Sequence, residues 1–359
     1  MSIVKKRKKT RQITIGSVKV GGGAPIAVQS MTNTYTQDVD ATVSQIRHLT
    51  MAGCEIIRVA VPDMEAAHAI KKIKAGIDIP LIADIHFDHR LAIAAAECGA
   101  DALRINPGNI GAESRVLKVV QCAKEHGISI RIGVNSGSLE KQIEQSMGNG
   151  PKAMAESARR NVELLQSMDF NDIKLSVKAS DVSRSVEACR LVSAQTDIPL
   201  HVGVTEAGGV IAGITKSALG IGMLLAEGIG DTIRVSLTRD PVEEVRTAWE
   251  ILRALGIRKR GVEIISCPTC GRCRIDLFDI AEKIEKALLK FKVPVKIAIM
   301  GCVVNGPGEA KEADIGIAGG DGMGILFKKG KLVRKVPQDR LMDVLLEEVK
   351  NFEKESGGN

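Results

Sequence analysis

Aromatic residues are scarce in this 359-residue chain. They make up only 2% of it, and tryptophan and tyrosine occur once each, as Trp249 and Tyr35. Proteins that bind single-stranded nucleic acids stack successive bases on aromatic side chains. The scarcity of such side chains therefore argues against a nucleic-acid partner.

Long hydrophobic runs are missing as well. No stretch approaches the roughly 20 consecutive apolar residues that span a bilayer, and no apolar signal core follows the basic start of the chain. We therefore expect a cytoplasmic protein with no membrane partner. Part of the net charge of +7 lies in that basic start, and we interpret it as a solvated arm. Its members are Lys5, Lys6, Arg7, Lys8, Lys9 and Arg11.

The remaining composition is that of a globular enzyme-sized protein, with 44% hydrophobic and 26% charged residues. Its length allows one large domain with an ample core and a smaller second domain. We place the first domain at residues 1–257 and the second at residues 258–359.

Eight apolar segments of strand length alternate with amphipathic helical segments in the first domain. The strand segments are PIAVQSMT, EIIRVAVP, PLIADIHF, ALRINPGN, SIRIGVNS, DIKLSVKAS, PLHVGVTEAG and TIRVSLT. Helices are predicted, for example, at residues 39–52 and 242–255, with Asp38, Ser180 and Asp240 as N-caps. This rhythm predicts a (β/α)8 barrel, and an open doubly wound sheet is the alternative.

Polar residues gather late in each of these strand segments, as they would at the single mouth of a barrel. Burying so many cations is costly unless something negative meets them, so we predict a site for a phosphorylated ligand. The alternative is that some of them form salt bridges inside the barrel with Asp84, Glu55 or Glu206. The polar strand-end residues are Gln29, Ser30, Arg58, Asp84, His86, Arg104, Asn106, Asn109, Arg131, Asn135, Lys174, Lys178, His201, Glu206, Arg234 and Ser236.

Glu206 is the candidate acid in this group. Glycines follow it in VGVTEAGG and allow the backbone to approach a ligand, and a carboxylate desolvated in a barrel mouth would have a raised pKa suited to proton transfer. The alternative is a carboxylate stabilised at a helix N-terminus. His86 and His201 could be catalytic, but each could equally be a core residue that forms a hydrogen bond to a neighbouring strand.

The second domain follows a basic linker after Gly256 and has an α+β pattern. We predict strands at residues 262–265, 295–300 and 315–318, a hairpin at 325–335, and helices at 277–291 and 341–352. Gly319, Gly320, Gly322 and Gly324 are interpreted as a hairpin connection, because no helix follows them as a nucleotide-binding loop would require.

Half of the eight cysteines lie in this domain. Cys267, Cys270 and Cys273 have CxxCxxC spacing in SCPTCGRC, and Cys302 opens GCVVNGPGE, which ends at Glu309. Such thiolates can hold an iron–sulfur cluster or a tetrahedral zinc ion, and the first pair alone could be a redox dithiol. Spacing alone does not name the metal. The other cysteines, Cys54, Cys98, Cys122 and Cys189, suit buried reduced thiols.

Several motifs together resemble the bacterial 4-hydroxy-3-methylbut-2-enyl diphosphate synthases, in their two-domain form. These motifs are CPTC, GCVVNGPGEA, ADIHFD, RINPGN, RIGVNSGSL, VKASD, HVGVTEAGG and GDTIRVSLT, and they span nearly the whole chain. The resemblance implies a TIM-type barrel that binds 2-C-methyl-D-erythritol 2,4-cyclodiphosphate and an α+β domain with a [4Fe-4S] cluster.

The resemblance also implies roles for particular residues. The cluster ligands would be Cys267, Cys270, Cys302 and Glu309, with Cys273 left over. The cyclic diphosphate would bind to Arg58, Arg104, Arg131, Asn135 and Lys178, and Glu206 would deliver a proton during a two-electron reductive dehydration that opens the ring.

Partners follow from the same resemblance. Flavodoxin or ferredoxin would supply the electrons, and a head-to-tail homodimer would lay one subunit's cluster domain over the other's barrel. Two rival interpretations stand beside this one: a phosphate-ligand TIM-barrel enzyme with a structural zinc domain, and a non-catalytic cluster protein acting as a sensor or nucleic-acid binder.

Overall fold

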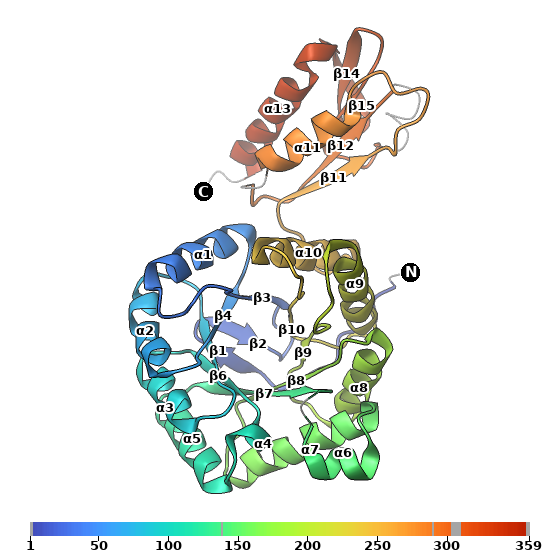
Figure 1. Cartoon of the computed structure of the whole chain (residues 1–359). Helices are drawn as coiled ribbons and strands as arrows, with labels where there is room; N and C mark the ends of the chain where they lie inside the picture. The colour runs from blue at the N-terminus through green and yellow to red at the C-terminus, as the bar shows by residue number, and fades with distance from the viewer. Residues whose placement is uncertain (1–2, 138, 289–290, 303–309, 357–359) are drawn as a thin grey trace. The chain divides into compact units, whose positions relative to one another are not determined.

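The computed structural model describes residues 3–137, 139–288, 291–302 and 310–356 of the chain. Glu309, one of the cluster ligands that the resemblance implies, lies outside the described residues. Two compact units divide the chain after Arg258 (Figure 1), and each is described by itself. Among the described helices, none combines the length and apolar character that crossing a bilayer requires.

Eight parallel strands form the sheet of the first unit, in the order β8-β7-β6-β5-β4-β3-β10-β9. A parallel bridge from Leu175 of β8 to Leu200, just before β9, joins the two ends. This confirms the (β/α)8 barrel and excludes the open doubly wound sheet. The strands are β3 (Ala27–Met31), β4 (Ile56–Ala60), β5 (Leu81–Asp84), β6 (Ala102–Ile105), β7 (Ser129–Asn135), β8 (Ile173–Lys178), β9 (His201–Val202) and β10 (Thr232–Ile233).

A ring of helices surrounds these strands (Figure 1). It comprises α1 (Val39–Ala52), α2 (Met64–Ala75), α3 (His89–Glu97), α4 (Pro107–Ile110), α5 (Glu113–Glu125), α6 (Lys141–Met147), α7 (Pro151–Ser167), α8 (Val182–Gln195), α9 (Val210–Ala226) and α10 (Pro241–Ala254). Asp38 and Asp240 accept backbone hydrogen bonds as the predicted N-caps. The prediction for Ser180 is wrong: Asp181 caps α8, because its carboxylate reaches the amide of Arg184.

The barrel strands divide their side chains between two environments, since successive residues point to opposite faces. Residues such as Ile57, Leu103 and Ile130 belong to the large apolar cluster that also contains the inner faces of the helices. The alternate residues point into the barrel. On β6 and β7 the residues that face the helices are apolar, whereas Arg104 and Arg131 point into the barrel and are charged.

A short hairpin, β1 (Ile13–Ile15) and β2 (Val18–Val20), closes the amino-terminal end of the barrel. Its residues Ile13, Ile15 and Val20 pack on the first inward residues of four strands, including Ile56 and Ile82. Apolar packing therefore fills the bottom of the barrel, and the charged side chains occupy the levels above it.

The basic start of the chain is not a free solvated arm, so that expectation needs correction. The backbone amides of Lys5 and Lys8 donate to the carbonyls of Ala226 and Gly228. Arg7 forms an ion pair of 2.5 Å with Asp231, whose side chain is only 2% exposed. The arm lies along the barrel because these hydrogen-bonding partners, remote in sequence, are brought to it by the fold.

The second unit has a five-stranded sheet in the order β11-β12-β13-β14-β15. The first three strands are parallel and the last three antiparallel, and two helices pack on the sheet. The predicted α+β pattern is confirmed, and the glycine-rich segment does connect β13 to β14. The elements are β11 (Val262–Ser266), α11 (Leu277–Leu288), β12 (Val295–Met300), β13 (Ile315–Ala318), β14 (Met323–Lys328), β15 (Lys331–Pro337), the 3-10 helix η1 (Gln338–Arg340) and α13 (Leu341–Ser356).

Candidate active site: a cationic barrel interior and a cysteine loop

Basic side chains from neighbouring strands meet inside the barrel. Arg104 of β6 is the Cα partner of both Asp84 on β5 and Arg131 on β7. Arg131 is in turn paired with Lys174 of β8, and Asn135 is paired with Lys178 further along the same two strands, two pleat repeats beyond the first pair. The parallel register therefore places four of the predicted phosphate contacts on adjacent strands, at two depths of the barrel.

Asp84 holds part of this cluster together. Its carboxylate lies 3.0 Å from Nη1 of Arg104 and 3.5 Å from Nε of Arg58. The expectation of internal salt bridges is thus right for these two arginines. Glu55 instead binds Arg258 at 2.8 Å, away from the polar interior.

Arg131 and Lys178 have no carboxylate within ion-pair distance among the described residues, although both are buried. Nε and Nη1 of Arg131 are also buried without a hydrogen-bond partner in that part of the chain. Buried charged groups need a counter-charge and hydrogen-bond acceptors to offset their desolvation. An anionic ligand with several oxygen atoms would supply both.

The crowding of cations changes their titration. Burial, and then repulsion from Arg131, lowers the pKa of Lys174 and of Lys178 well below the ordinary lysine value of 10.5. Burial also lowers the pKa of Arg58 to about 10, although the charge of Asp84 acts in the opposite direction. For Asp84, burial would raise the pKa, but the charge of Arg58 and the other cations hold it well below its usual range.

Two glycines make room for these long side chains. A Cβ at position 133 would lie 2.6 Å from Nε of Arg104, and one at position 203 would lie 3.0 Å from Nζ of Lys178 and 2.3 Å from the carbonyl oxygen of Arg234. Gly133 and Gly203 therefore leave space for cations where barrel interiors usually contain bulky branched residues.

The stability of the anion-free protein is expected to rise with pH between about pH 6 and about pH 8. In that window the unfolded chain keeps Lys174 and Lys178 protonated, whereas the folded barrel lowers their pKa, so the unfolded state binds more protons. Above it the buried thiols of Cys54 and Cys189, whose pKa is raised to about 12, act in the opposite direction.

The affinity for sulfate should fall as pH rises over the same window, because sulfate keeps its charge and binds more tightly to the protonated lysines. Melting temperatures measured with and without sulfate at both ends of the window test both signs. A sulfate effect that grows as pH rises would contradict this account of the barrel interior.

Glu206 lies just beyond β9 and is exposed, with a left-handed backbone at φ 50°. The barrel of its own chain therefore does not desolvate this carboxylate as the sequence argument assumed. A residue other than glycine in this backbone conformation is strained, and such strain is often found at functional sites. Glu206 is thus held at the strand end by the surrounding structure rather than by local preference.

The two histidines differ. His201 is fully buried and Nδ1 lies 2.8 Å from Oγ1 of Thr232, as expected for a core histidine, yet its Nε2 has no partner among the described residues. His86 is half exposed and contacts Asp84 and Arg104 at the cationic cluster.

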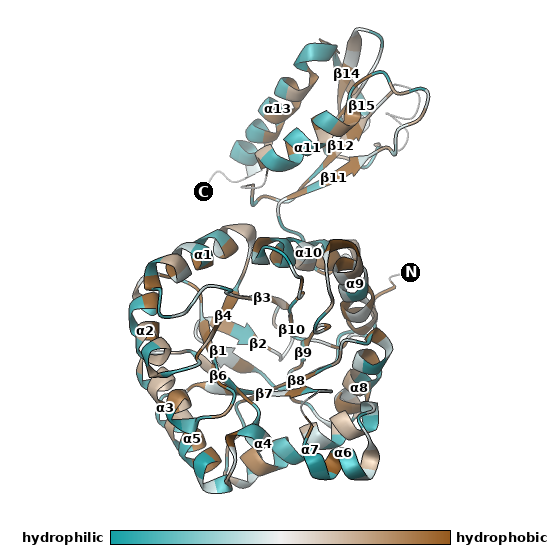
Figure 2. Cartoon of the chain, viewed as in Figure 1, coloured by the Kyte–Doolittle hydropathy of each residue, from teal (hydrophilic) through white to brown (hydrophobic). Residues whose placement is uncertain are grey.

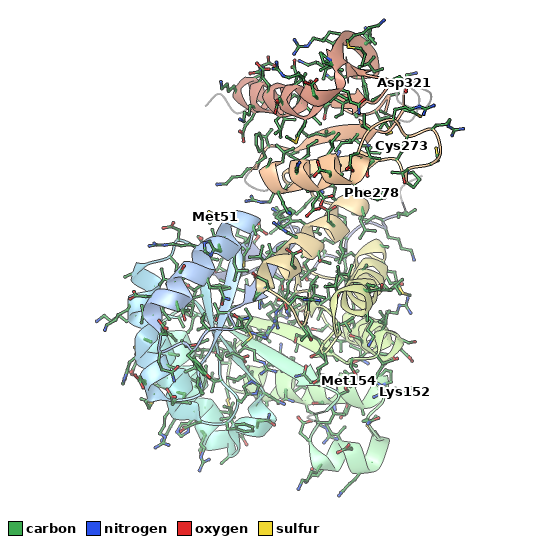
Figure 3. The ribbon with its side chains drawn as sticks, turned by 45° about the horizontal axis from the view of Figure 1, so that its top comes forward. Met51, Lys152, Met154, Cys273, Phe278 and Asp321 are labelled. Carbon is green, nitrogen blue, oxygen red and sulfur yellow. The ribbon has the colours of Figure 1, made fainter. Side chains whose placement is uncertain are left out.

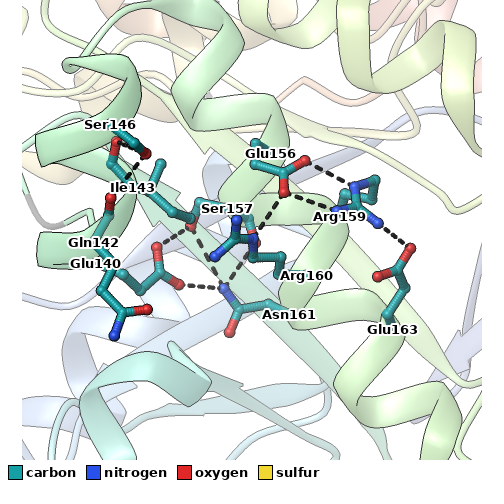
Figure 4. A network of polar contacts seen from close by, with 10 residues as sticks. All are labelled: Glu140, Gln142, Ile143, Ser146, Glu156, Ser157, Arg159, Arg160, Asn161 and Glu163. Carbon is teal, nitrogen blue, oxygen red and sulfur yellow. Dashed lines mark hydrogen bonds and ion pairs between the residues drawn. The ribbon is translucent and has the colours of Figure 1, made fainter.

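The segment that follows β7 is anchored outside the barrel. The carboxylate of Glu140 accepts hydrogen bonds from Ser157 at 2.6 Å and from Asn161 at 2.7 Å, both on α7 (Figure 4). This network ties down the loop that begins at Asn135. Its contribution to the site is to fix where that loop leaves the barrel mouth.

The cysteine loop of the second unit begins after β11 and returns beside the end of β12. Sγ of Cys267 accepts a hydrogen bond of 3.3 Å from the amide of Gly301, and a Cβ at position 301 would lie 2.5 Å from Sγ of Cys273. Two thiols thus lie against the residue that precedes Cys302. Thr269, between Cys267 and Cys270, has a left-handed backbone at φ 56°.

The cysteines of this loop differ in their exposure and in their hydrogen bonds. Cys270 is exposed, whereas Cys273 donates a hydrogen bond of 3.2 Å to the carbonyl of Ile275 and packs at the edge of the apolar core (Figure 3). No three metal-binding side chains of the described residues are arranged as a ligand set. The soft thiolate donors nevertheless fit an iron–sulfur cluster or zinc, and their convergence on Gly301 fits a single site.

Sequence reasoning did not single out every functional candidate. Lys174 was only one of many polar strand residues, and its burial beside Arg131 appeared with the structure. The contact of Arg58 with Sδ of Met31, at 2.9 Å from Nη2, was not anticipated either. The usable signal was the period-two pattern: Lys174, Ser176 and Lys178 lie on one face of β8.

Fold and site together define a class of enzyme: a (β/α)8 barrel with a cationic interior, joined to a thiol-rich α+β domain. Comparison with protein families specifies it further. The family model described as the GcpE TIM-barrel domain matches residues 10–249, and that of the GcpE protein C-terminal domain matches residues 263–351. The chain belongs to the GcpE family.

Curated relatives match along nearly the whole chain. The protein of Desulfotalea psychrophila is 58% identical over 353 residues, which are 97% of both chains. That of Caldanaerobacter subterraneus subsp. tengcongensis is 58% identical over 354 residues, covering 98% of this chain and all of that protein. Both are named 4-hydroxy-3-methylbut-2-en-1-yl diphosphate synthase (flavodoxin).

Solved structures resemble the chain more distantly. A dihydropteroate synthase of Yersinia pestis has a TM-score of 0.48 and 10% identity, covering 68% of this chain and 97% of that one. A type I 3-dehydroquinate dehydratase of Clostridium difficile has a TM-score of 0.49 and 14% identity, covering 69% and 98%.

Proposed function

We infer that the chain is an oxidoreductase that forms 4-hydroxy-3-methylbut-2-en-1-yl diphosphate in isoprenoid biosynthesis, with flavodoxin as electron donor. The relatives that carry this name match the chain from end to end. The single structural observation that supports it best is the barrel interior, where buried Arg131 and Lys178 have no carboxylate within ion-pair distance in the described part of the chain, and a diphosphate would provide that charge.

We propose 2-C-methyl-D-erythritol 2,4-cyclodiphosphate as the substrate, bound by Arg58, Arg104, Arg131, Asn135 and Lys178. Arg104 and Arg58 are oriented by Asp84, so their guanidinium groups are pre-positioned. Arg131 and Lys178 are free to direct their charge to the ligand. As the ring opens, charge gathers on the released diphosphate, and these buried cations stabilise it without waiting for solvent to reorganise.

A [4Fe-4S] cluster held by Cys267, Cys270, Cys302 and Glu309 is the proposed cofactor. When bound, it would supply the two electrons of the reduction one at a time. The chain's own contribution is to hold the thiolates: the left-handed backbone of Thr269 turns the loop between the first two, and the amide of Gly301 donates to Sγ of Cys267. Such hydrogen bonds to sulfur tune a cluster's reduction potential.

Glu206 is the proposed proton donor for the hydroxyl that leaves as water. Because Glu206 is exposed, closure around the substrate would have to exclude water from this carboxylate. In the proposed head-to-tail homodimer, the cluster domain of one subunit would cover the barrel mouth of the other.

An exposed apolar face on α9 supports self-association, because such faces are uncommon on monomers. Ile211 is 85% exposed and Leu219 is 53% exposed on this helix, which Figure 2 shows with hydrophobic colouring.

We propose residues 1–257 and 258–359 as the substrate and cluster domains. The cytoplasmic location expected from the sequence stays a prediction.

Anaerobic turnover tests the proposed function. Reconstituted protein, reduced flavodoxin and the cyclic diphosphate should yield 4-hydroxy-3-methylbut-2-en-1-yl diphosphate and one water for each pair of electrons consumed. Replacing Arg131 with methionine should raise KM for the cyclic diphosphate at least about tenfold, since a hydrogen-bonded charge is lost. Stoichiometric zinc without acid-labile sulfide would instead support the alternative, a barrel enzyme with a structural zinc domain.

A further inference from the structure

Lys174 is a buried lysine whose ammonium group has no hydrogen-bond partner among the residues that the structure describes. It lies on β8 with 1% of its surface exposed, and Nζ makes no hydrogen bond within the described part of the chain. Its neighbours Ile173 and Leu175 belong to the apolar core between strands and helices, so Lys174 points into the barrel. A buried ammonium group in this state destabilises a protein, and its presence therefore needs a reason outside stability.

The surroundings of Lys174 are cationic. Its Cα partner Arg131 carries two further buried nitrogen atoms without partners, and Nε2 of His201 is also buried and unpartnered. The charged and titratable groups coupled to Lys174 or to these neighbours are Arg58, Asp84, Arg104, Arg131, Lys178, His201, Asp231 and Arg234.

Two members of that group are acidic: Asp84, which is paired with Arg58 and Arg104, and Asp231, which already accepts other hydrogen bonds. The Asp231 carboxylate accepts from Arg7 at 2.5 Å, from Oγ1 of Thr10 at 3.1 Å and from the amide of Leu200 at 2.9 Å. Among the described residues, its ion pair is with Arg7 of the amino-terminal arm, and it makes no ion pair with Lys174.

We propose that Lys174 and Arg131 form the inner wall of the anion site, where oxygen atoms of one phosphoryl group accept hydrogen bonds from both side chains. This inference rests on the proposed function and extends its binding set by one residue. Lys178 lies four residues further along β8, about 13 Å at the usual rise of a strand. The two lysines thus approach the ligand from different depths, and the inner one anchors the diphosphate end.

This assignment has a consequence that a structural lysine would not share. Removing Lys174 takes an unpaired cation out of a cationic interior, so the anion-free protein should become no less stable. The same change should weaken anion binding. Stability and affinity are therefore expected to move apart, as they do where a residue is kept for binding rather than for folding.

The test compares wild type with Lys174→Met, which conserves volume, and Lys174→Gln, which keeps a hydrogen-bond donor without the charge. Lys152→Met, on the exposed side of α7 (Figure 3), is the control for loss of one positive charge. For each full-length protein we would measure the melting temperature without anion, the Kd for inorganic diphosphate by calorimetry, and turnover of the cyclic diphosphate.

Both Lys174 variants should melt at or above the wild-type temperature and bind inorganic diphosphate roughly 10- to 100-fold more weakly, as expected for loss of a hydrogen-bonded charge. The Lys152 variant should match wild type. An unchanged Kd overturns the inference, and so does a lower melting temperature in both variants. If the methionine variant does not fold, the glutamine variant decides by the same two measurements.

Wild-type turnover separates this inference from the proposed function. If wild type converts the cyclic diphosphate while the Lys174 variants bind and turn over normally, only the role of Lys174 is wrong. If wild type neither binds diphosphate nor converts the cyclic substrate, the proposed function fails first.

Discussion

Cys302→Ser is expected to remove the proposed iron–sulfur cluster and to reduce turnover to background. A neutral hydroxyl is a poor substitute for a thiolate, and the electrons of the reduction have no other route to the substrate. Iron and acid-labile sulfide per chain, measured after anaerobic reconstitution, should both fall with activity. The apolar core beneath the loop does not include Cys302, so the domain itself should remain folded.

Cys270 and Cys273 provide a matched pair for this experiment, since both lie on the same loop three residues apart. Cys270→Ser should lose the cluster, because its exposed thiol is proposed as a ligand. Cys273→Ser should keep it, because Sγ of Cys273 is already bonded to the carbonyl of Ile275. The reverse outcome would show that the ligand set is wrong and that the thiol beside Gly301 is the one used.

Glu206→Gln is expected to lower turnover by about 10²- to 10⁴-fold, the usual contribution of a general acid. Glutamine keeps the size of the side chain but cannot release a proton. Cluster content and the Kd for inorganic diphosphate should stay at wild-type values, since neither depends on this carboxylate. Full activity in the glutamine variant would mean that another group delivers the proton.

Glu206→Gly separates the chemistry of this residue from its strain. The left-handed backbone costs roughly 1–2 kcal/mol for a residue with a side chain, and the greater freedom of glycine in the unfolded chain offsets about 0.4–1 kcal/mol of the gain. The free energy of unfolding should therefore rise by up to about 1.6 kcal/mol while activity is lost.

Asp169→Gly is the control for this variant. Asp169 has a similar backbone at φ 55°, and its ion pair with Lys124 is exposed and contributes little. The free energy of unfolding of this variant, measured by denaturant titration, should rise by a comparable amount, and its activity should stay at the wild-type level. Loss of activity there would show that relief of strain, rather than loss of the carboxylate, explains the result at position 206.

The sequence alone determined the architecture and the family of this protein. Strand and helix periodicities are local patterns, so the eight units of the barrel could be located from residues such as those of β3 to β10, and both cap residues Asp38 and Asp240 follow from local hydrogen bonding. Motifs such as CPTC and GCVVNGPGE are contiguous as well, which is why the family could be predicted.

Only the tertiary structure decided which of the polar strand residues act together. Pairing depends on neighbours remote in sequence: Asp84 engages Arg58 and Arg104, whereas Arg131 and Lys174 form no ion pair with any described residue. The docking of the amino-terminal arm through Arg7 and Asp231 has the same origin. Burial, and hence the energy of every one of these charges, is set by the assembled barrel and by no single strand.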